Sequence, residues 1–404
     1  MSTAGERDRV LSGMRPTGRL HLGHYHGVLK NWARLQNEYD SFFFVADWHA
    51  LTTHYEDPGI MAANVWDMVI DWLAAGIDPD RATLFIQSRI PHHAELHLLL
   101  SMVTPLGWLE RVPSFKDQQK RLKDRNLATY GFLGYPLLQS ADILMYRASW
   151  VPVGEDQVPH VELTREIARR FNHIFGKDAE FEEKAEQAVT QLGKQAARSF
   201  RAARQSWLQN GDETARQGAR ELLEAGRNLG AEEKERLLGY LEGGGRTILT
   251  EPEALLTRDS KLSGLDGQKM SKSYNNTINM RDDPDRVAGA IRTMPTDPAR
   301  KRRNDPGDPD KCPVWDLHQI YTEDTVREQL AAGCRSAGIG CLDCKRPLID
   351  AVMEEQVALH ERARPYEEDP GQVRAIIDEG CARAEAVAAE TLREVRDVVG
   401  TVYS

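Results

Sequence analysis

The sequence lacks a basic charge excess and long apolar runs, and it has few cysteines. Its 404 residues carry a net charge of −10, which excludes a globally basic nucleic-acid binder and confines any RNA contact to local patches. No apolar run approaches the roughly 18–20 residues of a membrane span. Residues 1–9 hold no apolar segment of a secretion signal. We therefore expect a cytoplasmic protein with no membrane segment, long enough for two or more domains.

Four of the five cysteines are crowded into residues 312–344. Without a secretion signal, a disulfide scaffold is not expected, and a metal site in a reducing compartment is favoured. The spacing of Cys312, Cys334, Cys341 and Cys344 is C-x21-C-x6-C-x2-C, which can supply four thiolates to one centre. On ligand chemistry alone, zinc and a [4Fe–4S] cluster fit equally well.

The segment 12–27, SGMRPTGRLHLGHYHG, is a glycine-rich turn between a predicted strand at 9–11 and a predicted helix at 28–36. Glycines and a proline let its backbone bend tightly and approach a ligand, and the start of a helix favours an anion. His21 and His24 are three residues apart, close enough to share one face. Alone, the segment could equally be an ordinary strand-to-helix loop.

A second loop, 264–274, carries two lysines three positions apart, Lys269 and Lys272, within KMSKS. Mobile ammonium groups on such a loop suit an extended polyphosphate. Alone, KMSKS could be a solvated basic loop. Read with HLGH at 21–24, it resembles the paired signatures of the class I aminoacyl-tRNA synthetases. The resemblance implies that the first motif holds ATP near its α-phosphate and that the lysine loop stabilises the leaving pyrophosphate, with His21, His24, Lys269 and Lys272 as the catalytic groups.

Alternating strands and helices predict the fold. An apolar run begins at 41, with Asp47 and His49 at its end. A further strand is predicted at 82–88, and helices at 60–75 and 92–104. This alternation indicates an α/β fold with a doubly wound, Rossmann-like parallel sheet. His49 could bind a ligand or could be a packing histidine. The charged segment 111–125 is expected on the surface.

Two later segments carry polar groups that could serve a ligand. Within the mostly apolar 131–146, helical spacing places Tyr135, Gln139 and Asp142 on one face. These groups need partners, which could be a ligand or an internal polar cluster. Residues 149–172 predict a strand, a turn and a helix, with Asp156 at the turn, where a carboxylate can accept from ribose hydroxyls.

These segments sharpen the resemblance. DWHALT at 47–52, YPLLQSADIL at 135–144 and VPVGEDQ at 151–157 look like a tryptophanyl-tRNA synthetase over nearly the whole chain except one insertion. The resemblance implies that Asp142 accepts the indole N–H of L-tryptophan and that Tyr135 and Gln139 line its pocket. The implied ATP-binding residues are Arg15, Pro16, Thr17, Gly23, His24, Gly154, Glu155, Asp156, Lys269, Met270, Ser271, Lys272 and Ser273. Mg²⁺ should accompany ATP, and tRNA(Trp) and a homodimeric partner are implied in the same way.

The chain departs from many bacterial members at Arg15, where they have Gln, and at Gln139, where they have Met. Tyrosyl relatives share the pattern Tyr-x-x-x-Gln-x-x-Asp, so that pattern cannot separate indole from phenol. The GEDQ segment and the Thr after His-Ala-Leu favour tryptophan. A tyrosyl enzyme remains one alternative. A non-charging, metal-cluster regulatory or RNA-binding relative is the other.

Residues 177–250 interrupt the resemblance and predict two or three amphipathic helices, the last ended by the glycines at 243–245. An apolar stripe comprises Phe181, Ala185, Val189 and Leu192. A basic stripe comprises Lys194, Arg198, Arg201 and Arg204, which could contact tRNA or form a solvated face.

The predicted division is a catalytic domain at 1–176, the insertion at 177–250, the continued catalytic domain with the KMSKS loop at 251–285, and a helical anticodon-binding domain at 286–404. Gly371 and Gly380 are expected to break the last helices, and Cys381 to be a small packed residue. Within the family, one subgroup carries an iron–sulfur cluster on nearly this cysteine spacing. That resemblance favours [4Fe–4S] over zinc, with a structural or tRNA-docking role.

Overall fold

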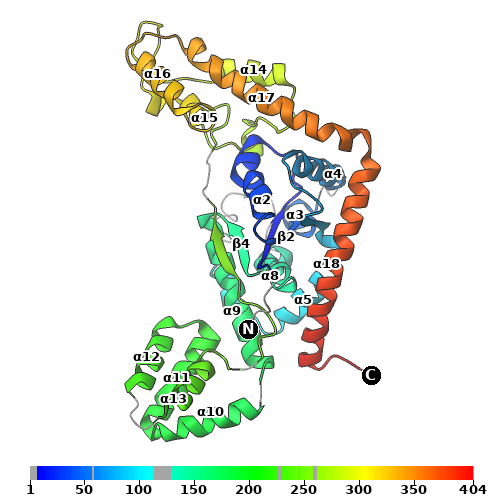
Figure 1. The fold of residues 1–404 in the computed structure, drawn as a ribbon, viewed down its shortest axis with the longest axis vertical. Coiled ribbons are helices and arrows are strands. Elements are labelled where there is room, and N and C mark those ends of the chain that lie inside the picture. Colours follow the sequence, from blue (N-terminus) through cyan, green and yellow to red (C-terminus); the bar gives the residue numbers. More distant parts are fainter. Residues whose placement is uncertain are drawn as a thin grey trace.

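A five-stranded parallel sheet forms the centre of the molecule, a computed structural model that describes residues 7–56, 59–112, 129–177, 179–225, 229–244, 246–257 and 262–403 (Figure 1). The strands are β1 (Arg9–Met14), β2 (Asp40–Val45), β3 (Ala82–Ile86), β4 (Trp150–Val153) and β5 (Glu253–Leu256). Their order is β3-β2-β1-β4-β5, so the chain builds outward from β1 on one side and then on the other. This confirms the predicted doubly wound α/β fold.

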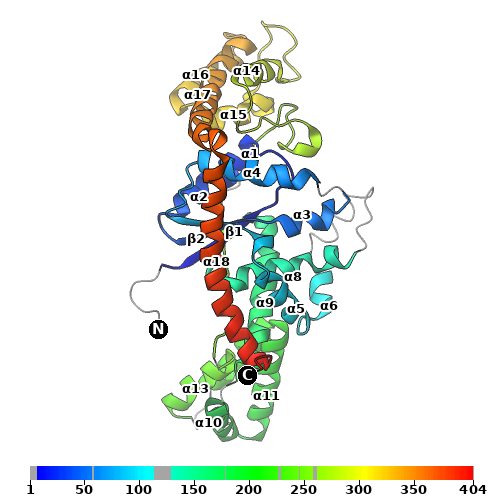
Figure 2. The same cartoon turned by 90° about the vertical axis from the view of Figure 1, so that its right-hand side faces the viewer.

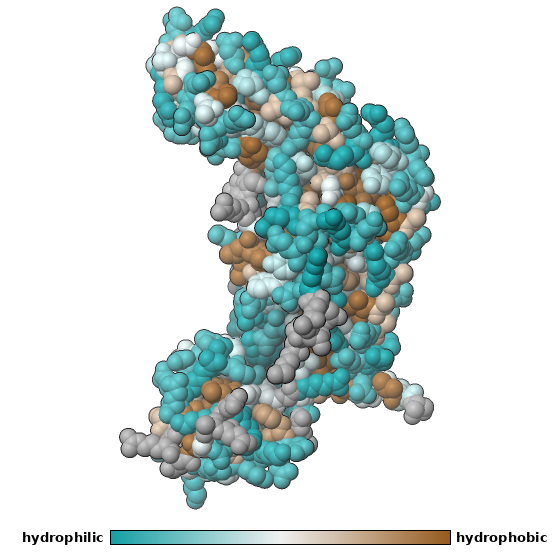
Figure 3. Space-filling view, viewed as in Figure 1, coloured by the Kyte–Doolittle hydropathy of each residue, from teal (hydrophilic) through white to brown (hydrophobic). Residues whose placement is uncertain are grey.

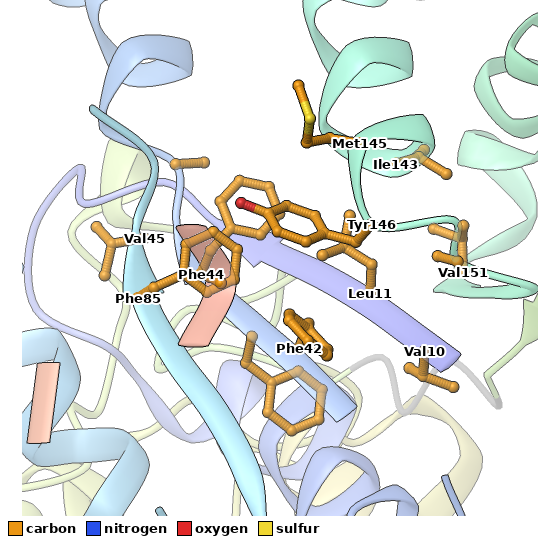
Figure 4. Close-up of a cluster of buried hydrophobic side chains, with 14 of the residues drawn as sticks. Val10, Leu11, Phe42, Phe44, Val45, Phe85, Ile143, Met145, Tyr146 and Val151 are labelled. Atoms are coloured by element: carbon orange, nitrogen blue, oxygen red, sulfur yellow. The ribbon is translucent and has the colours of Figure 1, made fainter. Parts of the chain in front are cut away.

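The strands form where the sequence is continuously apolar. Every residue of β3 is buried, as are all of β2 after its first residue, as expected of parallel strands that are covered on both faces. Aromatic rings dominate this core: the ring centroids of Phe42 and Phe85 lie 5.3 and 5.1 Å from that of Tyr146 (Figure 4). Trp32 stacks on Phe43 at 4.3 Å between centroids. Large buried rings therefore tie the sheet to the helices around it.

The helices between the strands confirm the predictions at 28–36, 60–75 and 92–104, with bounds shifted by a few residues. The described helices before the insertion are α1 (Leu22–His24), α2 (Lys30–Leu35), α3 (Asp47–His54), α4 (Gly59–Ala74), α5 (His92–Ser101), α6 (Leu106–Glu110), α8 (Tyr130–Met145) and α9 (Val158–Phe175). A π-helical segment, η1 (Tyr25–Leu29), joins α1 to α2, so helix begins earlier than predicted. Segments of this kind are common at functional sites. Most of the predicted surface segment 111–125 lies outside the described residues.

The insertion folds around its own apolar core, at the end of the molecule opposite α15 (Pro313–Tyr321) and α16 (Asp324–Arg335) (Figure 1). Its described part has four helices rather than the predicted two or three: α10 (Ala179–Gln191), α11 (Lys194–Asn210), α12 (Glu213–Ala225) and α13 (Ala231–Leu241). Ala185 and Val189 are buried in this core, with Phe181 and Leu192 packed against it, so the apolar stripe is confirmed. Gly243 and Gly244 follow α13 with positive φ, also as predicted.

The predicted basic stripe of the insertion does not form one exposed surface. Arg204 is 9% exposed, with its guanidinium 3.6 Å from the Tyr240 ring centroid. Arg201 pairs with Glu186, N to O 2.6 Å. Lys194 and Arg198 stay exposed. Two of the four cations therefore serve the insertion's own packing, which weakens the reading of the stripe as a tRNA contact.

The insertion docks on helix α9 through contacts between one tryptophan ring and two arginines. The guanidinium of Arg169, on α9, lies 4.0 Å from the ring centroid of Trp207. Arg216 lies 4.7 Å from the same centroid. Asn172, also on α9, accepts from the backbone N–H groups of Ile248 and Leu249, where the chain leaves the insertion. Helix α9 thus holds both the insertion's body and its exit.

The C-terminal residues form α14 (Pro284–Thr293), α15 (Pro313–Tyr321), α16 (Asp324–Arg335), α17 (Cys341–Glu368) and α18 (Pro370–Val399). α14, α15 and the first half of α17 share a second apolar core. α18 instead runs back along the molecule against β3, and its buried residues join the main core (Figure 2). The face in Figure 3 is mainly hydrophilic and is hollowed between the insertion and the C-terminal helices.

The predicted helix breaks at Gly371 and Gly380 are wrong. The break falls at Asp369, which caps α18, and Gly371 lies in the first turn of that helix. Gly380 lies inside α18 because a Cβ there would meet the carbonyl oxygen of Leu84 at 1.8 Å. This glycine marks a close helix-to-strand approach rather than an end. Cys381 beside it is buried, as predicted. None of the described helices has both the length and the apolar run that crossing a bilayer requires.

Candidate active site

A pocket of about 730 Å³ lies at the carboxyl ends of β1, β2 and β4. In open α/β sheets this is where ligands bind, beside the strand at which the winding direction reverses. Its volume is within the range of small-molecule sites, roughly 300–1,000 Å³. The turn after β1, helix α3, the middle and second half of α8, and the lysine loop all contribute to its wall.

Backbone hydrogen bonds join the segment around the histidine motif (residues 21–24) to the segment that follows the lysine loop (residues 264–274). The two motifs lie about 250 residues apart in the chain. The N–H of Leu22 donates to the carbonyl of Ile278 (2.9 Å), and the N–H of Met280 donates to that of Leu20 (2.9 Å). The Lys272 ammonium donates to the Gly18 carbonyl at 2.6 Å. Gly18 has φ +121°, a conformation that side chains rarely allow. The histidine motif and the lysine loop are therefore one structural unit.

Packing explains the glycine of the histidine motif. The rings of His21 and His24 lie 3.8 Å apart between centroids. A Cβ at Gly23 would meet the His21 ring at 2.9 Å, so only glycine lets this ring lie over the helix start. Burial, with the nearby charges of Lys272 and Lys269, lowers the pKa of His21 to about 4. Burial also holds the pKa of His24 well below its ordinary value. Both imidazoles are therefore neutral near pH 7.

The lysine loop is held in shape by one buried amide. Asn276 is 2% exposed and accepts from the Ser271 backbone N–H (2.8 Å). Its side-chain N–H groups donate to the Asp266 carboxylate (2.7 Å) and to the Lys269 carbonyl (3.2 Å). Burial lowers the pKa of Lys272 from 10.5 to about 8. The hydrogen bonds of Asn276 therefore fix the backbone that carries Lys269 and Lys272.

Most of the predicted ATP-binding residues line the pocket. Those that line it are Arg15, Thr17, Gly23, His24, Gly154, Lys269, Met270, Ser271 and Lys272, together with the predicted catalytic His21. Pro16 is buried beside them, and Glu155 and Asp156 are exposed on the adjoining turn, η3 (Glu155–Gln157). The side chain of Ser273 lies outside what the structure describes. Burial lowers the pKa of Arg15.

Tyr135, Gln139 and Asp142 project from α8 into the same pocket. Asp142 is 1% exposed and accepts hydrogen bonds from His49 (2.8 Å), His93 (2.7 Å) and Gln87 (2.8 Å). Burial raises the pKa of this carboxyl, but the bonds from His49 and His93 outweigh burial and bring it to about 2. Asp142 is therefore an ionised carboxylate that can only accept hydrogen bonds.

Sequence reasoning missed two of these donors. Gln87 directly follows β3, and the argument that singled out His49 at the end of β2 would have found it. His93 lies in the first turn of α5 and carries no such signal. Asp47, which the sequence placed near the site, caps local backbone by accepting from the N–H groups of Trp48 and Ser88.

The four clustered cysteines lie at the opposite end of the C-terminal part from α18, and all are partly buried. Burial and the charges of Cys312, Cys334 and Cys341 raise the pKa of Cys344 to about 12, so the four thiols are within electrostatic reach of one another. Among the described residues, no three His, Cys, Asp or Glu side chains are arranged to hold a metal ion.

The chain is similar to known proteins over nearly its whole length. The family profile of tRNA synthetases class I (W and Y) matches residues 3–192 and 220–355. A tryptophan–tRNA ligase of Ralstonia nicotianae is 62% identical over 98% of this chain and 99% of its own. One of Thermotoga maritima is 41% identical over 98% and 100%. The crystal structure of a Campylobacter jejuni tryptophanyl-tRNA synthetase, complexed with ADP and tryptophan, has a TM-score of 0.71 at 27% identity and covers 97% of this chain and 99% of its own.

Proposed function

The chain belongs to the class I tRNA synthetases for tryptophan and tyrosine and, among them, to the tryptophan–tRNA ligases, and from this we propose which of its groups act in each step. The enzyme activates L-tryptophan with ATP and transfers the tryptophanyl group to tRNA(Trp). ATP and Mg²⁺ are expected for such an enzyme. The observation that carries the assignment of roles is one pocket where the histidine motif, the lysine loop and a buried carboxylate meet.

In the first step a tryptophan carboxylate oxygen forms a bond to the α-phosphorus of ATP. The bond from that phosphorus to the bridging oxygen breaks, and pyrophosphate leaves. His21 and His24 are neutral and donate N–H groups to phosphate oxygens. Lys269 and Lys272 stabilise the charge that develops on pyrophosphate. Mg²⁺ bound with ATP would neutralise part of the phosphate charge.

The walls of the pocket orient the nucleotide. Arg15, Pro16 and Thr17 follow β1 and face the phosphates, and Met270, Ser271 and Ser273 close over them from the lysine loop. Gly154, Glu155 and Asp156 follow β4 on the adenosine side. The support for this assignment is that the ends of β1 and β4 are neighbours in the sheet, on the side where nucleotides bind.

Tryptophan occupies the part of the pocket under α8. Asp142 accepts the indole N–H, and Tyr135 and Gln139 bind the ammonium group. An ionised, buried carboxylate suits this role because it gains a donor from indole and is left unpaired by a ring without one.

The C-terminal part binds tRNA in this proposal, with residues 286–404 as the anticodon-binding domain. The remaining units are 1–176 and 251–285 for catalysis and the insertion at 177–250. Cys312, Cys334, Cys341 and Cys344 would be the ligands of a [4Fe–4S] cluster, with zinc as the alternative. Their mutual electrostatic reach supports this, and so does Arg300, whose guanidinium lies 3.7 Å from the Cys334 sulfur and suits a thiolate. The cluster holds the domain in shape.

We also propose that the enzyme is a cytoplasmic homodimer. Leu98, Met102 and Leu106 are 54%, 72% and 58% exposed and lie close together in the chain, on α5, directly after it and at the start of α6. Large apolar side chains exposed together are typical of protein interfaces.

The test is ATP–pyrophosphate exchange with L-tryptophan or L-tyrosine, followed by charging of tRNA(Trp). Exchange that depends on tryptophan and is lost in His21→Ala and in Lys269→Ala supports the proposal. Lys234→Ala, on the insertion surface, is the matched control. Exchange with tyrosine alone would point to the tyrosyl alternative. Wild-type protein that binds tRNA but catalyses neither reaction would favour the non-charging alternative.

A further inference from the structure

Three donors from three separate elements surround the carboxylate of Asp142. Its Oδ1 accepts from Nδ1 of His93 (2.7 Å) and from the amide of Gln87 (2.8 Å). Its Oδ2 accepts from Nε2 of His49 (2.8 Å) and, more weakly, from the same Gln87 amide (3.0 Å). A carboxylate oxygen has two in-plane lone pairs. Both lone pairs of Oδ1 therefore accept a hydrogen bond. Oδ2 has one donor of its own and shares the Gln87 amide with Oδ1, so it can accept one more hydrogen bond.

His93 also bonds outward, to a residue that does not line the pocket. Its Nε2 lies 2.7 Å from the Tyr146 hydroxyl, and both side chains are fully buried. Tyr146 and Asp142 are four residues apart at the end of α8. The His93 ring therefore bridges two successive turns of one helix. The Tyr146 ring is fixed in turn between Phe42 and Phe85.

The proton positions follow from the ionised carboxylate. Because Asp142 can only accept, Nδ1 of His93 must carry a hydrogen. In the neutral ring Nε2 is then a bare acceptor, and the hydroxyl of Tyr146 donates to it. The hydroxyl thus selects the tautomer that faces Asp142 with a donor.

We propose that Tyr146 and His93 are positioning residues for tryptophan selection, an inference that rests on the proposed function. They occupy Oδ1 and fix the carboxylate plane, so that Oδ2 is the oxygen offered to the indole N–H. His49 and Asp142 line the pocket, whereas His93 and Tyr146 do not. Without the hydroxyl, the ring can take the other tautomer, whose bare Nδ1 repels the carboxylate and lets it turn.

The experiment compares two substrates in ATP–pyrophosphate exchange: L-tryptophan and β-(benzothiophen-3-yl)-L-alanine, which has sulfur in place of the indole N–H. In Tyr146→Phe we expect the ratio of kcat/KM for tryptophan to that for the analogue to fall about tenfold, as the loss of one bond in a charged network implies. The fall should come from the KM for tryptophan, with kcat and the analogue's constants nearly unchanged.

The matched control is Tyr240→Phe, which removes a hydroxyl-to-carboxylate bond of 2.9 Å in the insertion and should leave the ratio unchanged. His93→Asn keeps an N–H donor near the position of Nδ1 and should retain more of the preference than His93→Leu. If both substrates lose the same factor in Tyr146→Phe, or neither changes, the inference is wrong. Wild-type enzyme without tryptophan-dependent exchange would instead overturn the proposed function.

Discussion

Replacing Gly380 with Ala should push α18 away from β3 and destabilise the protein. The added Cβ would lie 1.8 Å from the Leu84 carbonyl oxygen, whereas ordinary contact begins at 3.4 Å, so the helix must withdraw by about 1.6 Å. Overpacking of this kind costs about 1–3 kcal/mol of folding free energy. Because the clash at Gly380 is with the backbone of Leu84 and not with a flexible side chain, we expect a cost at the upper end of that range. The higher helix propensity of alanine relative to glycine offsets about 1 kcal/mol of this cost. The net expectation is a destabilisation of about 2 kcal/mol, measured by urea unfolding.

The matched control is Gly289→Ala on α14, where a Cβ meets nothing within 4 Å. There only the propensity acts, so the variant should be more stable than wild type by up to about 1 kcal/mol. Because β3 leads into Gln87, a donor to Asp142, the Gly380 variant should also raise the KM for tryptophan. If Gly380→Ala unfolds at the same or a higher urea concentration than wild type, the account of the helix-to-strand contact is refuted.

Two further outcomes are expected. Burial lowers the pKa of Lys272 to about 8, so the ammonium loses its proton as pH rises through that value and the KM for ATP should rise above about pH 8. Lys272→Arg stays charged and should have a flat profile there; a flat wild-type profile would contradict the assignment. Protein purified without oxygen should be coloured and contain about four irons and four sulfides per chain. Cys344→Ser should lose the iron and Cys381→Ser should keep it, and one zinc per chain in colourless protein would identify zinc instead.

The features that sequence reasoning could reach are those with local causes. The strands β2 and β3 are buried on both faces, and a continuous run of apolar residues in the sequence predicts burial of this kind. The close approach of the rings of His21 and His24 depends on their spacing of three residues and on Gly23 between them. Breaks at Gly193 and Gly211, both with positive φ, separate α10 from α11 and α11 from α12. They could have revealed the extra insertion helix.

Long-range packing accounts for what could not be predicted. Gly380 resembles a helix breaker in sequence, and only the nearness of β3 shows why a helix needs it. Arg204 and Arg201 have the spacing of an exposed stripe. In the structure, however, each contacts a residue more than ten positions away in the chain. The donors to Asp142 are assembled from three elements, and no spacing rule connects them.

The position of α18 has a consequence for the order in which the chain is synthesised. β3 is an edge strand, complete at Ile86, but the helix that lies against it ends only at Val399. At about 5–20 residues per second, the edge waits roughly 15–60 s for its cover during synthesis. An apolar strand with an open edge is a template for unwanted pairing. The nascent chain should therefore depend on chaperones until its last helix emerges, and messages that stop early should yield aggregating fragments rather than a smaller enzyme.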